Sequence, residues 1–535
     1  MKLWLKFCLL CVFVILSNIA FWQRTYSLLE ASKWISLIAY LGLFFISLIC
    51  FFITAFHPSR VLRALLGSCI FLSTVVGMTY YGVSNHYISF LDLELMWISK
   101  ANTSDAILFY LDEIFFSFLV ACLGLAGMLL EVRTRYQLNK TIISIFPFLP
   151  FILLSATTFA KKGYGTEGMP QQYSTASTFL LFGAYEIFSP SLVSEREQLD
   201  VFPAKNKKFN KILYIVDESI RADYLDLNYS RKLTPFLSTQ EKRIANFGAI
   251  ASGNNCSGYA NLILRTGVSR KNLTKIGTIP LIWDYVKNAG MKAYYYDAQQ
   301  TDGLLQNFMN NDEKKKIDHF IQFDGVSKSL VDHKLAQDLN TRLKSNESAF
   351  IYVNKRGAHF PYNESYPKKE SFYLPQMRPF EELGASKKRL INSYKNSIRW
   401  NVDEFFKLLL HEVDLSDTLI VYTSDHGQNL MDRGVMTHCN TQTPHPYEGL
   451  VPFFVMTDNI KQLNQFKSWA KISSNKLNHF YIFPLLVDSL GYDENVLMQI
   501  NENKVFVPDN ALKEFSLGPL IPRFGRPIMW QSTQL

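Results

Sequence analysis

A concentration of long apolar stretches at the start of the chain constrains the fold most strongly. Five lie in the first 160 residues, at Leu3–Trp22, Trp34–Phe56, Val61–Val83, Ile114–Leu130 and Ile142–Ala160. All five approach the roughly 20 helical residues that cross the hydrocarbon core of a bilayer. The first stretch lacks the small-residue cleavage site of a signal peptide, so we interpret it as a retained anchor. The sequence therefore predicts an α-helical membrane domain of five transmembrane helices over residues 1–160.

Charged residues divide the chain at the same place. Residues 1–160 carry ten basic and seven acidic side chains, whereas residues 161–535 carry 45 and 39. The second part thus has nearly the charge density of an ordinary soluble domain. The net charge of +9 is spread over both parts, unlike the concentrated basic surface of a nucleic-acid-binding protein. We therefore expect a membrane-anchored protein with a large water-exposed domain and no nucleic-acid partner.

Basic residues in the short loops indicate the orientation of the predicted spans. With a cytoplasmic N-terminus, seven lie on the cytoplasmic side: Lys2, Lys6, Arg60, Arg63, Arg133, Arg135 and Lys140. Only Arg24, Lys33 and Lys100 lie in the opposite loops. Because five crossings end on the far side, everything after Ala160 is predicted to be exported.

Two acidic residues, Asp112 and Glu113, precede the fourth span on the exported side. They are either the solvated end of a helix or a polar mouth that faces a lipid headgroup. The second interpretation follows from the rule that acidic residues at membrane depth are usually functional. Both interpretations stay open from the sequence.

Residues 209–535 alternate short β-rich runs with helical patterns. The runs are Ile212–Val216, Ala293–Tyr296, Phe350–Val353, Leu419–Thr423 and Val451–Val455, and helical segments such as Ile282–Ala289 and Leu390–Leu410 lie between them. This pattern indicates an α/β domain with a mainly parallel central sheet covered on both faces. Residues 161–208 mix Gly, Pro and Ser with an apolar patch, which predicts a linker along the membrane surface.

Polar residues follow three of these runs, at the strand ends where ligands gather in parallel sheets. Glu218 follows the first run, His359 the third, and Asp425 and His426 the fourth. His438 comes 12 residues after His426. Carboxylates and imidazoles are ligands that Zn²⁺ accepts, so we predict a divalent metal site at this edge of the sheet.

At these residues the chain resembles the phosphoethanolamine transferases of Gram-negative envelopes, in the alkaline phosphatase/sulfatase superfamily. Asp217–Asp223 is similar to the family's Gly-Glu-Thr-x-Arg-Ala segment, so that Glu218 matches its metal ligand. Ser424–Gly427 and the later His438 match a Ser-Asp-His-Gly block and its later histidine. Gly357–Pro361, which contains His359, resembles a Gly-Ser-His-Gly-Pro segment. The resemblance implies an inner-membrane protein with a periplasmic, sulfatase-like catalytic domain at residues 209–535.

The nucleophile segment departs from the family pattern, which usually has a Thr in a Cys-Gly-Thr-x-Thr-Ala-like stretch. Residues 247–259 read FGAIASGNNCSGY, and aligning Phe247 and Ser252 with their counterparts places Ser257 at the nucleophile. Cys256 is the rival, because sulfatases use Cys or Ser in a motif with a proline two residues on. That proline is absent after both Cys256 and Ser257.

The resemblance implies Zn²⁺ held by Glu218, Ser257, Asp425 and His426, with one ion tightly bound and a second left open. Ser257 would take phosphoethanolamine from phosphatidylethanolamine as a covalent phospho-enzyme and pass it to the lipid A or core of lipopolysaccharide. His359 and His438 would contact phosphate oxygens, bind a second metal or donate a proton. The expected protein is a monomer that works in the bilayer.

Other outcomes stay open from the sequence. The chain is alternatively a glycerol-phosphate transferase or phosphodiesterase of the same superfamily, or a lipid-binding pseudoenzyme. Cys256 and Cys439, the two cysteines of the exported domain, either pair or stay free. Gln428 and Asn429 stand where the family commonly has Glu-Ser, with an effect that the sequence leaves open. Arg265 is expected to be solvated, with neutralisation of a phosphate as the alternative.

Overall fold

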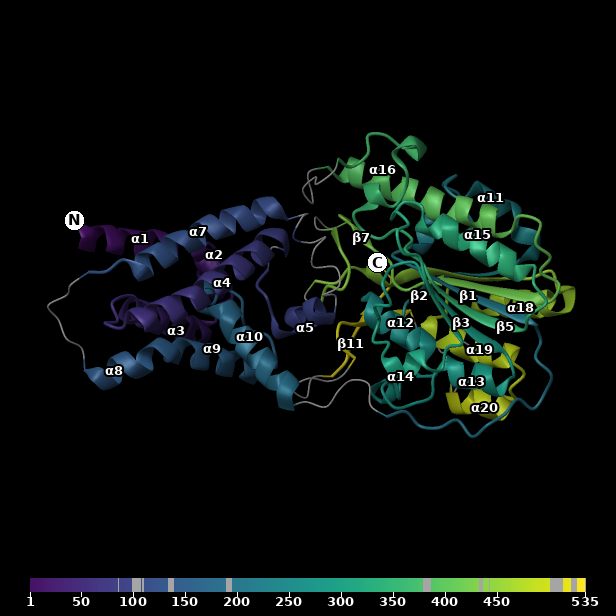
Figure 1. Cartoon of the computed structure of the whole chain (residues 1–535), viewed down its shortest axis with the longest axis horizontal. Coiled ribbons are helices and arrows are strands. Elements are labelled where there is room, and N and C mark those ends of the chain that lie inside the picture. Colours follow the sequence, from purple (N-terminus) through teal and green to yellow (C-terminus); the bar gives the residue numbers. More distant parts are fainter. Residues whose placement is uncertain are drawn as a thin grey trace. The chain divides into compact units, whose positions relative to one another are not determined.

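The computed structural model describes residues 1–84, 86–98, 107, 110–132, 139–188, 195–378, 386–432, 436–441, 443–500, 513–520 and 527–534. The chain forms two compact units that divide between residues 190 and 191 (Figure 1). Lys100, Arg133 and Arg135, which entered the prediction of orientation, lie outside the described residues.

The described part of the first unit is helical. Its helices are α1 (Lys2–Ser17), α2 (Ala20–Glu30), α3 (Trp34–Ala55), α4 (Arg60–Ser84), α5 (Phe90–Ile98), α7 (Leu111–Leu129), α8 (Lys140–Ile145), α9 (Leu149–Ala160) and α10 (Gln171–Phe188). Helix α4 packs along α7, and α10 packs against α4 and α9. Asp112 and Glu113 lie in the first turn of α7, where their charges favour the helix N-terminus.

Three of the five predicted spans are single helices long and apolar enough to cross a membrane: α3, α4 and α7. The first predicted span is instead the pair α1 and α2, bent by 53°. Asn18 lies at the bend, and its side chain accepts a hydrogen bond from the backbone N–H of Gln171 (3.0 Å) at the start of α10.

The fifth predicted span also differs from a single long helix. A short 3₁₀ turn, Phe146–Phe148, separates α8 from α9, and the apolar helical stretch Phe146–Ala160 is shorter than the three spans. Pro147 and Pro150 lack the N–H that a continuous helix would use at these positions. By length and composition, the described residues thus supply three spans, or four if the bent pair crosses as one, rather than clearly five.

The predicted linker, residues 161–208, contains a long helix. Its residues Gln171–Phe188 form α10, and the first eight of these residues are buried. The first unit therefore continues past residue 160. A course along the membrane surface stays a prediction for this segment.

The second unit is built on a seven-stranded sheet with the strand order β2-β9-β6-β1-β5-β3-β4. The strands are β1 (Lys211–Asp217), β2 (Ile244–Ala251), β3 (Lys292–Asp297), β4 (His319–Gln322), β5 (Ala349–Asn354), β6 (Thr418–Ser424) and β9 (Leu450–Met456). Strands β6, β1, β5, β3 and β4 run parallel, which confirms the mainly parallel sheet. Strand β9 runs antiparallel to β6 and β2. The beginning of β9, rather than its end, therefore lies at the edge where the parallel strands end.

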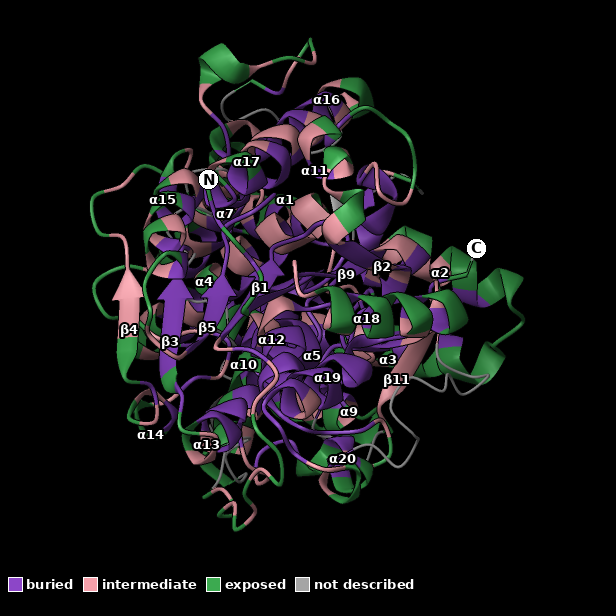
Figure 2. Cartoon of the chain, turned by 90° about the vertical axis from the view of Figure 1, so that its right-hand side faces the viewer, coloured by how far each residue is buried: buried purple, intermediate pink, exposed green. Residues whose placement is uncertain are grey.

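Helices cover both faces of the sheet, and buried side chains form one apolar cluster on each side. Alternate residues of β1 divide between the clusters: Ile212, Tyr214 and Val216 join one, and Leu213 and Ile215 join the other. The first cluster includes α12 (Ser257–Arg265), α13 (Ile282–Asn288), α18 (Ile460–Ser473), α19 (Ile482–Ser489) and α20 (Glu494–Ile500). The second includes α11 (Pro235–Thr239), α15 (Val331–Leu343), α16 (Lys387–Ile398) and α17 (Phe405–Leu409). Figure 2 shows the central strands buried and β4 more exposed at the edge.

Short elements complete the second unit. They are α14 (Asn311–Lys314), a π-helical turn at Arg399–Glu404 and the two-stranded sheets β7 (Asn429–Leu430) with β8 (Met436–Thr437) and β10 (Glu514–Leu517) with β11 (Met529–Ser532). The β7–β8 pair follows the end of β6, and it leads the chain to His438.

Candidate active site

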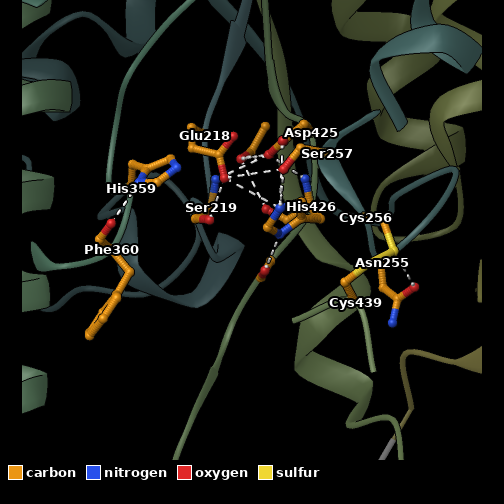
Figure 3. A network of polar contacts seen from close by, with 12 residues as sticks. Glu218, Ser219, Asn255, Cys256, Ser257, His359, Phe360, Asp425, His426 and Cys439 are labelled. Carbon is orange, nitrogen blue, oxygen red and sulfur yellow. Dashed lines mark hydrogen bonds and ion pairs between the residues drawn. A yellow bond between two sulfur atoms is a disulfide. The ribbon is translucent and has the colours of Figure 1, made fainter. Parts of the chain in front are cut away.

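Three potential metal ligands meet at the carboxyl ends of two neighbouring strands. Glu218 follows β1, and Asp425 and His426 follow β6 (Figure 3). One ligand atom from each lies within 4.8 Å of the others, and all three side chains are buried. His426 Nε2 is 3.3 Å from Glu218 Oε1 and 3.6 Å from Asp425 Oδ2. The pairing of β1 with β6 thus brings together residues that are 207 positions apart in the sequence.

Ser257 lies against this cluster from another element. It is the first residue of α12, and its Oγ is 2.9 Å from His426 Nε2 and 3.5 Å from Glu218 Oε1. The N-terminus of a helix directs backbone N–H groups and a partial positive charge toward an anion. The arrangement therefore places a hydroxyl at a helix N-terminus, beside buried carboxylates and an imidazole.

The electrostatics of the cluster favour a bound cation. Burial and the neighbouring Glu218 raise the pKa of Asp425 well above its usual range. Burial by itself would lower the pKa of His426, but Asp425 and Glu218 outweigh it and raise this pKa to about 9. Two carboxylates buried side by side repel each other, and a metal ion relieves that repulsion.

The donor set fits a zinc ion. Asp425 Oδ2 is buried and has no hydrogen-bond partner among the described residues, so it is free to act as a ligand. Two carboxylates and an imidazole, with a hydroxyl close by, are oxygen and nitrogen ligands of the kind that Zn²⁺ binds. The structure thus brings together all four residues that the sequence predicted as ligands: Glu218, Ser257, Asp425 and His426.

The two predicted accessory histidines, His438 and His359, lie beside the metal cluster in different ways. The ring of His438 stacks on that of His426, with centroids 4.3 Å apart. Burial, followed by the charge of His426, lowers the pKa of His438 to about 3. His359 is drawn on the Glu218 side of the cluster in Figure 3, and its Nδ1 is 2.6 Å from the carbonyl oxygen of Phe360. Burial and then Arg356 lower the pKa of His359.

Cys256 and Cys439 form a disulfide. The pairing that the sequence left open is therefore present. It also removes the rival nucleophile, because the sulfur of Cys256 is not a free thiol. The hydroxyl of the neighbouring Ser257 lies against the cluster.

Two residues that the sequence reasoning missed hold Glu218 in place. Gln299 donates from Nε2 to Glu218 Oε2 (3.1 Å) and to the carbonyl oxygen of Lys355 (2.8 Å). Ser219 donates from Oγ to Glu218 Oε1 (2.7 Å) and has a left-handed φ of 60°. Gln299 follows the end of β3, so the rule that polar residues gather at strand ends would have found it.

Arg265 corrects another expectation. Its side chain is fully buried rather than solvated, and Nε donates to Glu313 Oε1 at 2.7 Å. Nη2 donates to the carbonyl oxygen of Asn307 at 2.7 Å. The buried guanidinium lies at the end of α12 opposite Ser257 and is paired with Glu313, so it supports the fold rather than binding a phosphate.

Gln428 and Asn429, at the departure from the family's Glu-Ser, are also buried. Asn429 accepts a hydrogen bond from the backbone N–H of Asp432 (2.9 Å), and the carbonyl oxygen of Gln428 accepts one from Arg221 (3.3 Å). Both contacts stabilise the loop after β6. Neither residue replaces a member of the metal cluster.

A mainly parallel sheet with a carboxylate–imidazole cluster at its strand ends, and a hydroxyl beside that cluster, fits the sulfatase-like catalytic domain that the sequence predicted. The sulfatase family matches residues 210–492, just over half of the chain. The chain belongs to this family.

Similar proteins narrow the class further. Kdo(2)-lipid A phosphoethanolamine 7''-transferase of Escherichia coli (strain K12) is 24% identical over 318 residues, which cover 56% of this chain and 55% of that protein. The alignment thus spans about half the length of this relative. The resemblance to phosphoethanolamine transferases that the sequence predicted is confirmed.

Solved structures share the fold. The integral membrane protein lipooligosaccharide phosphoethanolamine transferase A from Neisseria meningitidis matches with a TM-score of 0.65 at 17% identity, over 92% of this chain and 98% of its own. The C-terminal periplasmic domain of EcEptC from Escherichia coli, in complex with Zn, matches with a TM-score of 0.50 at 18% identity. It covers 63% of this chain and 96% of its own.

Proposed function

We propose that this protein transfers phosphoethanolamine from phosphatidylethanolamine to the lipid A or core of lipopolysaccharide, in a metal-dependent reaction through a phosphorylated Ser257. The observation that carries the proposal is the position of Ser257 Oγ, 2.9 Å from His426 Nε2 and 3.5 Å from Glu218 Oε1 at the start of α12. A hydroxyl at this point is in reach of a phosphorus atom whose oxygens face the helix N-terminus.

The substrate class rests on the relatives and on the membrane unit. The Escherichia coli relative is named for the transfer of phosphoethanolamine to Kdo(2)-lipid A. The helices α3, α4 and α7 would anchor the protein in the inner membrane, with the second unit in the periplasm. Anchoring beside lipid substrates raises their effective concentration at the site.

Glu218, Asp425 and His426 would hold one Zn²⁺, with Ser257 Oγ as a fourth ligand. A zinc-bound relative of the same fold supports this metal. When bound, the ion supplies positive charge that favours the alkoxide form of a serine hydroxyl.

The chain's own residues perform the transfer in two steps. Ser257 Oγ forms a bond to phosphorus, the bond from phosphorus to the diacylglycerol oxygen breaks, and diacylglycerol leaves with a proton. An acceptor oxygen on lipopolysaccharide then forms its bond to the same phosphorus, and Ser257 Oγ leaves and regains a proton. His359 and His438 would hold the phosphate oxygens during both steps.

The test uses the purified full chain in vesicles that contain phosphatidylethanolamine and lipid A. We expect diacylglycerol release, lipid A that gains phosphoethanolamine and, when the acceptor is omitted, a modified Ser257 peptide in mass spectrometry. Ser257→Ala should lower the rate at least 10³-fold. Ser252→Ala is the matched control, because the Ser252 hydroxyl donates to the Asn254 carbonyl oxygen and not to the cluster.

Other results would overturn the proposal. Undiminished transfer by Ser257→Ala would reject the nucleophile. Turnover of phosphatidylglycerol instead would indicate a glycerol-phosphate transferase, and water as the acceptor would indicate a phosphodiesterase. Lipid binding with no turnover would indicate a pseudoenzyme.

A further inference from the structure

The Cys256–Cys439 disulfide joins two segments that are 183 residues apart, and each cysteine is the direct neighbour of a predicted catalytic residue. Cys256 precedes Ser257, and Cys439 follows His438. Figure 3 shows the cross-link beside the Glu218–Asp425–His426 cluster. The other five cysteines are free and lie in the first unit, so a reductant has one disulfide to act on.

Hydrogen bonds connect the same two segments. The backbone N–H of Cys439 donates to the carbonyl oxygen of Asn255 (2.8 Å), and Asn255 Nδ2 donates to the carbonyl oxygen of Asn440 (3.0 Å). Glu448 Oε2 accepts from Asn255 Nδ2 (2.9 Å) and from the backbone N–H of Asn440 (3.3 Å). The disulfide is thus the covalent part of a larger connection between the Ser257 and His438 segments.

The backbone at Cys439 needs such support. Its φ of +60° lies in the left-handed region, which is unfavourable for residues other than glycine. Such a conformation persists where the surrounding contacts impose it. The bonds to Asn255 and Cys256 are contacts of this kind.

His438 is held differently from the metal ligands. Glu218, Asp425 and His426 directly follow strands of the seven-stranded sheet, whereas His438 follows the two-residue strand β8. Strand β8 pairs only with the equally short β7 among the described strands. On the other side of His438, the segment is held at Cys439 by the disulfide and by the hydrogen bond to Asn255.

We propose that the Cys256–Cys439 disulfide is a positioning cross-link of the active site, which fixes His438 relative to Ser257 so that both residues meet the same phosphoryl group. This inference rests on the proposed function of Ser257. The cross-link itself makes no contact with substrate and acts through the two neighbouring residues.

Loss of the disulfide should change the rate of the chemical step and the zinc affinity to different extents. A misplacement of about 1 Å can cost about 100-fold in rate. We therefore expect loss of the disulfide to lower kcat about 10- to 100-fold with little change in KM. Zinc affinity should stay within a few-fold of wild type, because three of the four predicted ligands do not depend on the cross-link.

The experiment compares the wild-type chain with Cys256→Ala/Cys439→Ala, and uses Cys122→Ala, a free cysteine of α7, as the matched control. Transfer is measured in lipid vesicles, and zinc affinity by competition with a chromogenic chelator. A lower kcat with retained zinc affinity supports the proposal, since a misfolded variant would lose both. Equal kcat in the double variant and the control would overturn it.

Reduction provides an independent arm. Dithiothreitol gives two electrons and two protons to the disulfide, which becomes two thiols while dithiothreitol closes to its cyclic disulfide. Hydrogen exchange at residues 436–441 should speed up on reduction and slow again on reoxidation. Unchanged exchange would overturn the proposal. This experiment needs no substrate. It therefore tests the role of the disulfide even if the wild-type chain shows no transfer activity and the proposed function is wrong.

A double-mutant cycle with His438→Ala identifies the residue through which the disulfide acts. If the cross-link positions His438, its loss should lower kcat less than 3-fold in the His438→Ala background. A loss as large as in the wild-type background would show that the disulfide does not act through His438, and would overturn the proposal.

Discussion

The buried ion pair between Arg265 and Glu313 allows a prediction whose size follows from the structure. The two side chains are 0% and 3% exposed, and Nε and Oε1 are 2.7 Å apart. Trp283 Nε1 also donates to Glu313 Oε1 at 2.9 Å. Arg265→Met retains much of the side-chain length but leaves the buried carboxylate of Glu313 without a cation.

Removing one partner of a buried ion pair costs about 3–5 kcal/mol, because the remaining charge stays buried without its counter-ion. We therefore expect Arg265→Met to lower the free energy of unfolding by roughly 3–5 kcal/mol at pH 7.

The assay is urea unfolding of the full chain in detergent at pH 7. Arg265→Met/Glu313→Gln should recover much of the loss, because it removes both charges. Arg231→Met is the matched control, since Arg231 is 41% exposed and its ion pair with Asp223 should contribute under about 1 kcal/mol. A loss below about 1 kcal/mol for Arg265→Met, or no recovery in the double variant, would refute the reasoning.

Three further predictions concern the site and its surroundings. Gln299→Met should weaken zinc binding about 10- to 100-fold by freeing Glu218, whereas Gln300→Met on the same loop should not, as measured by chelator competition. Burial raises the pKa of Glu448 from 4.5 to about 7, so its folded form holds a proton that the unfolded form has lost between these pH values. The free energy of unfolding should fall with rising pH across this window by roughly 3 kcal/mol from this group, and Glu448→Gln should show a shallower fall in pH-dependent urea titrations. Removal of zinc with a chelator should abolish transfer and lower the unfolding temperature. Added zinc at 100 times its Kd should raise the free energy of unfolding by about 2.7 kcal/mol. An unchanged melting curve would argue against a structural contribution of the metal.

Much of the second unit could be predicted from local sequence patterns. Each of the five predicted apolar runs is a strand, because a short apolar run with helices on both sides has few alternatives to a buried strand. Glu218, Asp425 and His426 were found because parallel strands end at one edge, which turns positions far apart in the sequence into neighbours. The direction of β9 could not be predicted in this way, since an apolar run reads alike in both directions.

The membrane unit was less predictable in its details. Apolar composition identified the helical region, but it could not show that Asn18 lies at a bend and caps α10. It also could not show that Pro147 and Pro150 accompany a break between α8 and α9. The first feature depends on a hydrogen bond between helices far apart in the sequence, whereas the second is a local effect of two prolines that apolar composition does not register.

The sequence by itself determined the apolar first part, the mainly parallel sheet and the residue types that gather at its edge, because these follow from periodicity and from chemistry at strand ends. Only the tertiary structure decided that Cys256 is held in a disulfide while Ser257 keeps a free hydroxyl, that Arg265 is buried in an ion pair, and that Gln299 holds Glu218. Each of these depends on a partner from 48 to 183 residues away in the chain. Contacts between residues so far apart in the sequence form only when the sheet and its helices pack together. A local sequence pattern therefore cannot predict them.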